Sequence, residues 1–183
     1  MSTLDGRRAE TEERVRDLQS KLSEAEKLLD GKACVYATGS FGRGEAHQAS
    51  DLDLFIAGLT TVDAKENIKR LLGPLDEICV KAELIQATRN SNIPDFDGEG
   101  RYLVHYSIPE LITTLGKPED DANNTFTARL LLLLESRPIL IQVYDEVIGA
   151  VIAAYWEDYE DHKQDFVPAF LTNDILRLWR TFA

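Results

Sequence analysis

One segment of the chain, residues 37–54, constrains the fold and the chemistry of this protein more than any other. It reads ATGSFGRGEAHQASDLDL and overlaps two apolar runs that have the length and composition of buried β-strands. A Gly-Ser turn at Gly39 and Ser40 lies near its start, and two carboxylates, Asp51 and Asp53, lie near its end. The pattern predicts two strands that meet at a polar site.

The residue types in this segment indicate which ligand the site takes. Gly39 has no Cβ, so the backbone and the Ser40 hydroxyl can approach a triphosphate closely. Asp51 and Asp53 on a strand would point to the same face, because side chains alternate with a period of two. Paired carboxylate oxygens beside a phosphate suit Mg²⁺. We therefore predict a nucleotide- and metal-binding site.

The composition is that of a globular protein with an acidic surface. The 183 residues are 44% hydrophobic and 28% charged, which suits one domain or one and a half. The net charge of −12 argues against binding a long nucleic acid through its backbone. It is compatible with a single nucleotide held through metal ions.

The chain shows no targeting or membrane signal. Its N-terminus is polar and charged, and the apolar run 130–134 is far too short to cross a bilayer. We expect a cytoplasmic protein without a membrane partner. Cys34 and Cys79 both lie in apolar surroundings, and we expect two buried, reduced thiols.

Hydrophobic spacing and turn residues predict the elements of the first half. We expect helices over 5–29 and 62–72, strands over 32–38, 52–57 and 101–107, a turn over 39–44 that opens a short helix, and a polar loop over 89–100. The segment 75–87 fits a helix or a strand equally well.

Beyond residue 108 the pattern predicts helices only, over 109–115, 120–136, 144–158 and 166–182. The chain is therefore expected to be α+β, with an α/β unit followed by an all-α half. We place the divisions at an N-terminal helix 1–31, an α/β core 32–116 and a helical region 117–183. The chain ends without a helix-terminating signal, which favours a fragment of a longer protein.

The motif resembles the signature of the DNA polymerase β-like nucleotidyltransferase superfamily. The matching residues are Gly39-Ser40, Gly42-Arg43-Gly44 and Ser50-Asp51-Leu52-Asp53-Leu54. The Gly-Arg-Gly spacing is similar to the branch that contains PII uridylyltransferase and glutamine synthetase adenylyltransferase. The segments 102–108 and 124–137 are similar to that branch's histidine-containing strand and its helix with threonine and glutamate.

The resemblance implies a small mixed sheet flanked by helices, and a role for each motif residue. Asp51 and Asp53 would be catalytic metal ligands for Mg²⁺ or Mn²⁺. Arg43 would face phosphate or Asp51. The nucleotide-binding residues implied by the motif are Gly39, Ser40, Gly42, Arg43 and Ser50.

One departure from the superfamily concerns its usual third carboxylate on a neighbouring strand. The segment 101–107 contains no acid, and His105 lies near the expected position. We take Asp97 as the third catalytic acid. The other candidates are Asp95, Glu99 and, if its segment is a strand, Glu83.

The resemblance implies transfer of a nucleoside monophosphate, AMP or UMP, from ATP or UTP to a hydroxyl with release of pyrophosphate. The acceptor would be a protein or a small molecule. A different class of function also fits the sequence: a non-catalytic nucleotide-binding regulatory or antitoxin-like module that interacts with another protein.

Overall fold

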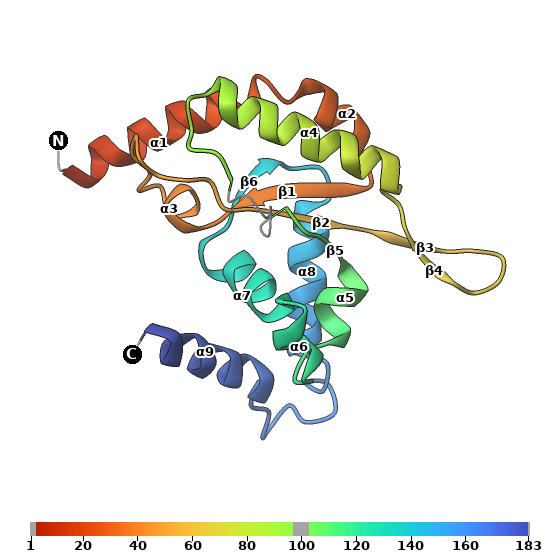
Figure 1. Ribbon diagram of the computed structural model, residues 1–183. Coiled ribbons are helices and arrows are strands. Elements are labelled where there is room, and N and C mark those ends of the chain that lie inside the picture. Colours follow the sequence, from red (N-terminus) through yellow and green to blue (C-terminus); the bar gives the residue numbers. More distant parts are fainter. Residues whose placement is uncertain (1–2, 97–102, 183) are drawn as a thin grey trace.

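A mixed four-stranded sheet forms the centre of the protein in the computed structural model, which describes residues 3–96 and 103–182 (Figure 1). The strands are β1 (Ala33–Ala37), β2 (Leu54–Gly58), β5 (His105–Ser107) and β6 (Arg137–Leu140), in the spatial order β5-β2-β1-β6. β1 is antiparallel to both β2 and β6, whereas β2 and β5 are parallel. The α+β class and the mixed sheet are as predicted.

Helices cover both faces of the sheet (Figure 1). One face carries α1 (Thr3–Gln19), α2 (Ser23–Leu29) and α4 (Pro74–Asn90), and the other carries α5 (Ile108–Thr113), α7 (Thr125–Glu135) and α8 (Tyr144–Tyr155). In β1, Val35 packs into the first layer and Tyr36 into the second. Every residue of β1 and β2 is buried, which explains why both read as continuous apolar runs.

Two helices predicted in the first half are wrong in part or entirely. The segment 5–29 forms two helices, because the chain turns at residues 20–22 while Leu22 stays buried. The segment 62–72 is not helical but belongs to a hairpin of β3 (Thr60–Val62) and β4 (Ile68–Arg70). Asp63 explains the hairpin: its side chain accepts hydrogen bonds from the backbone N–H groups of Lys65 and Asn67 and closes the turn.

Other expectations in this half fare differently. The segment 75–87, which fitted a helix or a strand, lies in helix α4. The polar loop predicted from residue 89 begins only after Asn90, where α4 ends. The predicted strand 101–107 is confirmed over its last three residues. The remainder of that loop, 97–100, lies outside the described residues. Cys34 is buried as predicted, but Cys79 is exposed on α4.

The prediction that only helices follow residue 108 is also wrong. β6 adds a strand to the sheet at the edge beside β1. Pro138 stands in this strand, and proline is tolerated there because an edge strand has one unpaired side. The helix predicted over 120–136 is split into α6 (Glu119–Ala122) and α7 by Asn124, which has a left-handed φ of 56°. The proposed division near residue 116 stays a prediction, although β6 belongs to the sheet.

A buried ion network joins the helices of the second half. The guanidinium of Arg129, on α7, is fully buried and donates to both carboxylate oxygens of Asp120 at 3.0 and 2.9 Å. It also donates to Asp174 at 2.7 Å and to the Tyr155 hydroxyl at 2.8 Å. Asp174 lies on α9 (Ala169–Phe182), and Arg177 of the same helix bonds both acids at 3.0 Å. Burial of these charges is compensated within the network.

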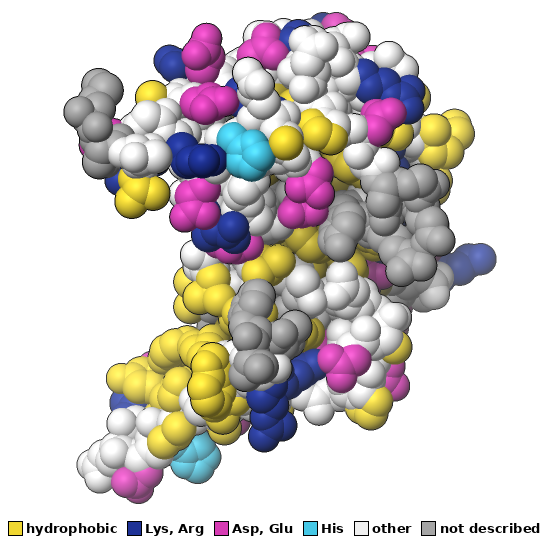
Figure 2. Space-filling view, turned by 60° about the vertical axis from the view of Figure 1, so that its left-hand side comes forward, with side chains coloured by type: hydrophobic (Ala, Val, Ile, Leu, Met, Phe, Trp, Pro, Cys, Tyr) yellow, Lys and Arg dark blue, Asp and Glu magenta, His cyan; other side chains and the backbone are white. Residues whose placement is uncertain are grey.

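Helix α9 turns its charged side toward the body of the protein and its apolar side outward. Asp174 is 1% exposed, whereas Ile175, Leu176 and Trp179 are 47%, 49% and 68% exposed. Hydrophobic side chains gather over the part of the surface where α9 lies (Figure 2). None of the helices within the described ranges is long and apolar enough to cross a membrane.

The end of α7 touches the short helix α3 (Gly39–Gly42), which follows β1 directly. A Cβ placed on Gly42 would lie 1.9 Å from the carbonyl oxygen of Glu135 and 3.1 Å from that of Ala37. Only a glycine fits between these two backbones. The contact fixes the last turn of α7 against the first turn of the motif.

We expect Arg129→Met to lower the free energy of unfolding by about 3 kcal/mol or more, because Asp120 and Asp174 lose their buried partner. Urea denaturation measures the change. The control is Lys27→Met, which removes an exposed ion pair with Glu24 and should cost less than about 1 kcal/mol. Equal losses of unfolding free energy in the two variants would show that the buried network stabilises the fold no more than an exposed ion pair does.

The Gly42 contact predicts opposite effects for the same substitution at two glycines. Gly42→Ala should destabilise the protein by about 1–3 kcal/mol through overpacking against Glu135. Gly149→Ala, in α8, meets nothing within 4 Å and should stabilise it by up to about 1 kcal/mol. Thermal and urea unfolding of the pair test the contact, and a neutral Gly42→Ala variant would refute it.

Candidate nucleotide-binding site

The two halves of the motif meet where β1 ends and β2 begins. Beyond the last register pair, Ala37 with Leu54, the backbone N–H of Thr38 donates to the Asp53 carbonyl at 2.9 Å. Gly39 follows with a left-handed φ of 62°, and a Cβ there would lie 2.6 Å from a carboxylate oxygen of Asp53. Glycine at this position therefore serves both the turn and the close approach of the acid.

The prediction that the two carboxylates lie on the strand is wrong, because both lie just before it. Residues 51–53 are irregular, and β2 begins at Leu54. Asp51 is exposed, and Asp53 is half-buried. Burial raises the pKa of Asp53, and the nearby charges of Asp51 and Glu135 raise it further, while Arg43 opposes them. The site therefore concentrates negative charge around a half-buried carboxylate.

The loop between the two halves is organised by its own polar residues. Ser50 is buried, and its hydroxyl accepts a hydrogen bond from the His47 backbone N–H at 3.0 Å. His47 Nδ1 accepts from the Ala49 backbone N–H at 3.1 Å. On the other side, Arg14 of α1 donates to the His47 carbonyl and stacks over the Phe41 ring at 4.9 Å. Ser50 thus shapes the loop that leads to Asp51.

Glu135 is a site residue that the sequence analysis missed. Its Oε1 accepts a hydrogen bond from the Gly39 backbone N–H at 2.9 Å, and its Oε2 pairs with the guanidinium of Arg43 at 2.7 Å. Arg43 also bonds Glu45 at 2.9 Å. Arg43 therefore faces two carboxylates in this structure, and neither is Asp51. The Glu-containing helix noted in the resemblance was the available signal, but 96 residues separate Glu135 from Gly39.

None of the four candidates for the third carboxylate is a described residue on a strand of the sheet. Asp97, the preferred candidate, and Glu99 lie outside the described residues. Asp95 is exposed and pairs with Arg89 at 2.8 Å, and Glu83 lies on helix α4 and not on a strand. Among the described residues, no group of three or more histidine, cysteine, aspartate or glutamate side chains is arranged to hold a metal ion.

His105, near the expected position of that acid, has a different environment. It is buried on β5, and its Nδ1 lies 2.9 Å from the carboxylate of Glu77. Burial lowers its pKa, although Glu77 opposes the shift. His105 is therefore a core residue that connects the sheet to α4.

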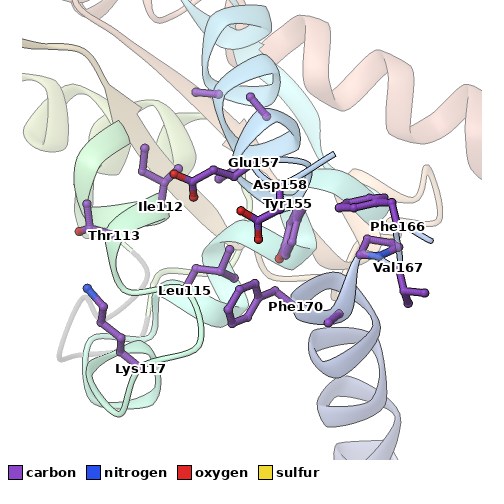
Figure 3. Close-up of a pocket in the computed structure, with 15 residues that line it drawn as sticks. Ile112, Thr113, Leu115, Lys117, Tyr155, Glu157, Asp158, Phe166, Val167 and Phe170 are labelled. Carbon is purple, nitrogen blue, oxygen red and sulfur yellow. The ribbon is translucent and has the colours of Figure 1, made fainter. Parts of the chain in front are cut away.

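A separate cavity of about 720 Å³ lies among α5, the end of α8 and residues 166–170 (Figure 3). Its walls are mainly apolar, with Leu115, Tyr155 and Phe170 among them, and Glu157 and Asp158 add two carboxylates. All the described residues that line it lie beyond residue 111. The cavity therefore shares no lining with the motif, and we assign it no role in this site.

Comparison with family models matches residues 15–99 to the nucleotidyltransferase domain. The comparisons with curated proteins and with solved structures gave no match. The matched segment runs from α1 through α4 and contains the Gly39 turn together with Asp51 and Asp53. The match covers less than half of the chain and indicates a nucleotidyltransferase domain in that segment.

Proposed function

We propose that the protein is a metal-dependent nucleotidyltransferase that moves AMP or UMP from ATP or UTP to an acceptor hydroxyl. The family match supports nucleotidyl transfer in general. The observation that carries the proposal at this site is the Thr38–Asp53 hydrogen bond of 2.9 Å, which holds the Gly39 turn beside the acid pair. A phosphate-binding turn and carboxylates side by side are what such a transfer needs.

The residues present fit a divalent cation. Asp51 and Asp53 offer carboxylate oxygens, and phosphate oxygens and water would complete the six ligands of Mg²⁺ or Mn²⁺. Burial, and after it the negative charges of Asp51 and Glu135, raise the pKa of Asp53, and a bound cation would favour its ionised form. When bound, the metal would increase the acidity of the acceptor hydroxyl and neutralise charge on the pyrophosphate.

In the reaction, the acceptor oxygen forms a bond to the α-phosphorus while the bond from that phosphorus to the bridging oxygen breaks. Pyrophosphate leaves with the electron pair, and the hydroxyl proton is released to the medium. Ser40, half-buried in the turn, would hold the β- or γ-phosphate by its hydroxyl. The chain thus contributes position and electrostatics more than covalent chemistry.

The negative net charge indicates which chemical class of acceptor the protein would favour. A net charge of −12 disfavours long nucleic acids and favours a cationic small molecule or a protein acceptor. One observation favours a second candidate, a non-catalytic nucleotide-binding module: the segment 101–107, where the superfamily usually has its third carboxylate, contains no acid.

The transfer assay separates these candidates. The protein is incubated with each of four α-labelled nucleoside triphosphates, Mg²⁺ or Mn²⁺, and cell lysate. We expect Asp51→Ala/Asp53→Ala to reduce labelling by about 100-fold or more, because loss of outer-shell residues alone costs a metal site about 10–100-fold. Glu24→Ala/Glu26→Ala, exposed acids with the same spacing on α2, is the charge-matched control. Undiminished labelling by the Asp double variant would refute the assignment.

Asp53 should lower the stability of the metal-free protein, although the proposed activity needs its carboxylate. A raised pKa means that ionised Asp53 destabilises the fold, so its contribution to stability is favourable at low pH and is lost as the pH rises through the folded-state pKa. Asp53→Asn should therefore raise the Tm of the metal-free protein at neutral pH, with a smaller gain in acid.

Asp51→Asn, at an exposed position, is the control and should change the Tm less. Added Mg²⁺ should raise the Tm of the wild type and not that of Asp53→Asn, by linkage to binding. A lower Tm for Asp53→Asn at neutral pH would contradict the electrostatic account of the site.

A further inference from the structure

Glu135 bonds two residues that the motif implies for nucleotide binding, Gly39 and Arg43. A carboxylate and a phosphate use the same donors, backbone N–H groups and guanidinium groups. The two oxygens of Glu135 each take one such donor, the Gly39 N–H at 2.9 Å and the Arg43 guanidinium at 2.7 Å. The Glu135 side chain is 17% exposed and that of Arg43 is 46% exposed, so a ligand can reach this pair from solvent.

The position of Glu135 is built into the fold. Its backbone carbonyl packs against Gly42 so closely that no Cβ fits there, which anchors the end of α7 beside the turn. The next residues enter β6, which pairs with β1. Two tertiary contacts therefore fix the backbone of Glu135 beside the turn, and its side chain reaches Gly39 and Arg43 from that position.

The electrostatic setting argues against Glu135 and a triphosphate sharing these donors. Glu135 lies close enough to Asp53 to raise the pKa of that acid, and Asp51 adds a further negative charge. Arg43 is the cation at this point, and Glu45 already pairs with it at 2.9 Å. A phosphate that arrived beside an unmoved Glu135 would meet repulsion in a half-buried site.

We propose that Glu135 is an internal anion that occupies the phosphate-binding donors in the nucleotide-free protein and that an incoming triphosphate displaces. The inference rests on the proposed function and adds a regulatory feature to the same site. Because the donors are free in only a fraction of molecules, the apparent affinity for nucleotide falls by that fraction. In the alternative, Glu135 is a positioning residue that stays bonded to Gly39 when nucleotide binds. Removing its carboxylate would then weaken nucleotide binding and not strengthen it.

Isothermal titration calorimetry with Mg²⁺ and inorganic tripolyphosphate, ATP or UTP tests the proposal. Tripolyphosphate probes the donors without any contribution from a base. We expect Glu135→Gln and Glu135→Ala to bind tripolyphosphate about tenfold more tightly than the wild type, the expected result when a competing internal anion is removed. Unchanged or weaker binding in both variants would overturn the proposal in favour of a positioning role.

Glu45→Gln is the matched control. It removes a carboxylate from Arg43 but leaves the Gly39 N–H bonded to Glu135, so its affinity should change by less than about twofold. A tenfold gain in tripolyphosphate affinity in this variant as well would show a general charge effect, and the proposal that Glu135 is displaced would be wrong. If neither nucleotide nor tripolyphosphate binds the wild type or any variant, the proposed function itself fails.

A measurement on the unaltered protein covers the case in which the Glu135 variants do not fold. Titration with Mg²⁺ and tripolyphosphate should shift the side-chain carboxyl resonance of Glu135 toward that of a solvated glutamate. A carboxyl resonance that stays in place while tripolyphosphate binds would show that the bond to Gly39 survives, and the proposal would be wrong.

Discussion

The pairing of β1 with β2 is the constraint on which the rest of the structure depends. Both strands are buried along their whole length, and their antiparallel register continues past Ala37 and Leu54 into the hydrogen bond from Thr38 to Asp53. A shift of one residue would move every side chain of β1 to the other helical layer. The same shift would separate the Gly39 turn from the acid, so core packing and site geometry are set together.

The second half of the chain takes part in the site and does not merely cover the sheet. β6 pairs with β1, and the end of α7 meets α3 at the Gly42–Glu135 contact. The buried Arg129 network ties α7 to α6, α8 and α9. The network therefore helps to position α7, the helix whose last residue contacts the turn.

The sequence allowed prediction of local features and failed where tertiary contacts decide. The two apolar runs and the Gly-Ser and Asp-Leu-Asp elements all lie within residues 33–57, and the structure brings them together. The spacing of Val62, Ile68, Leu71 and Leu72 also fits a helix, whereas the structure forms a hairpin whose turn the side chain of Asp63 closes. The resemblance pointed to a glutamate-containing helix, but the place of Glu135 at the turn depends on a backbone contact between α3 and α7 that the sequence does not reveal.

The charges at the site also bear on the form in which a nucleotide would bind. A metal-free triphosphate would approach the carboxylates of Asp51, Asp53 and Glu135, and Glu45 partly neutralises the neighbouring cation Arg43. A triphosphate that carries Mg²⁺ brings the cation that Asp51 and Asp53 need and reduces its own charge. Under the proposed function, the metal complex is therefore the species that binds, and displacement of Glu135 follows from the phosphate arriving with its own counterion.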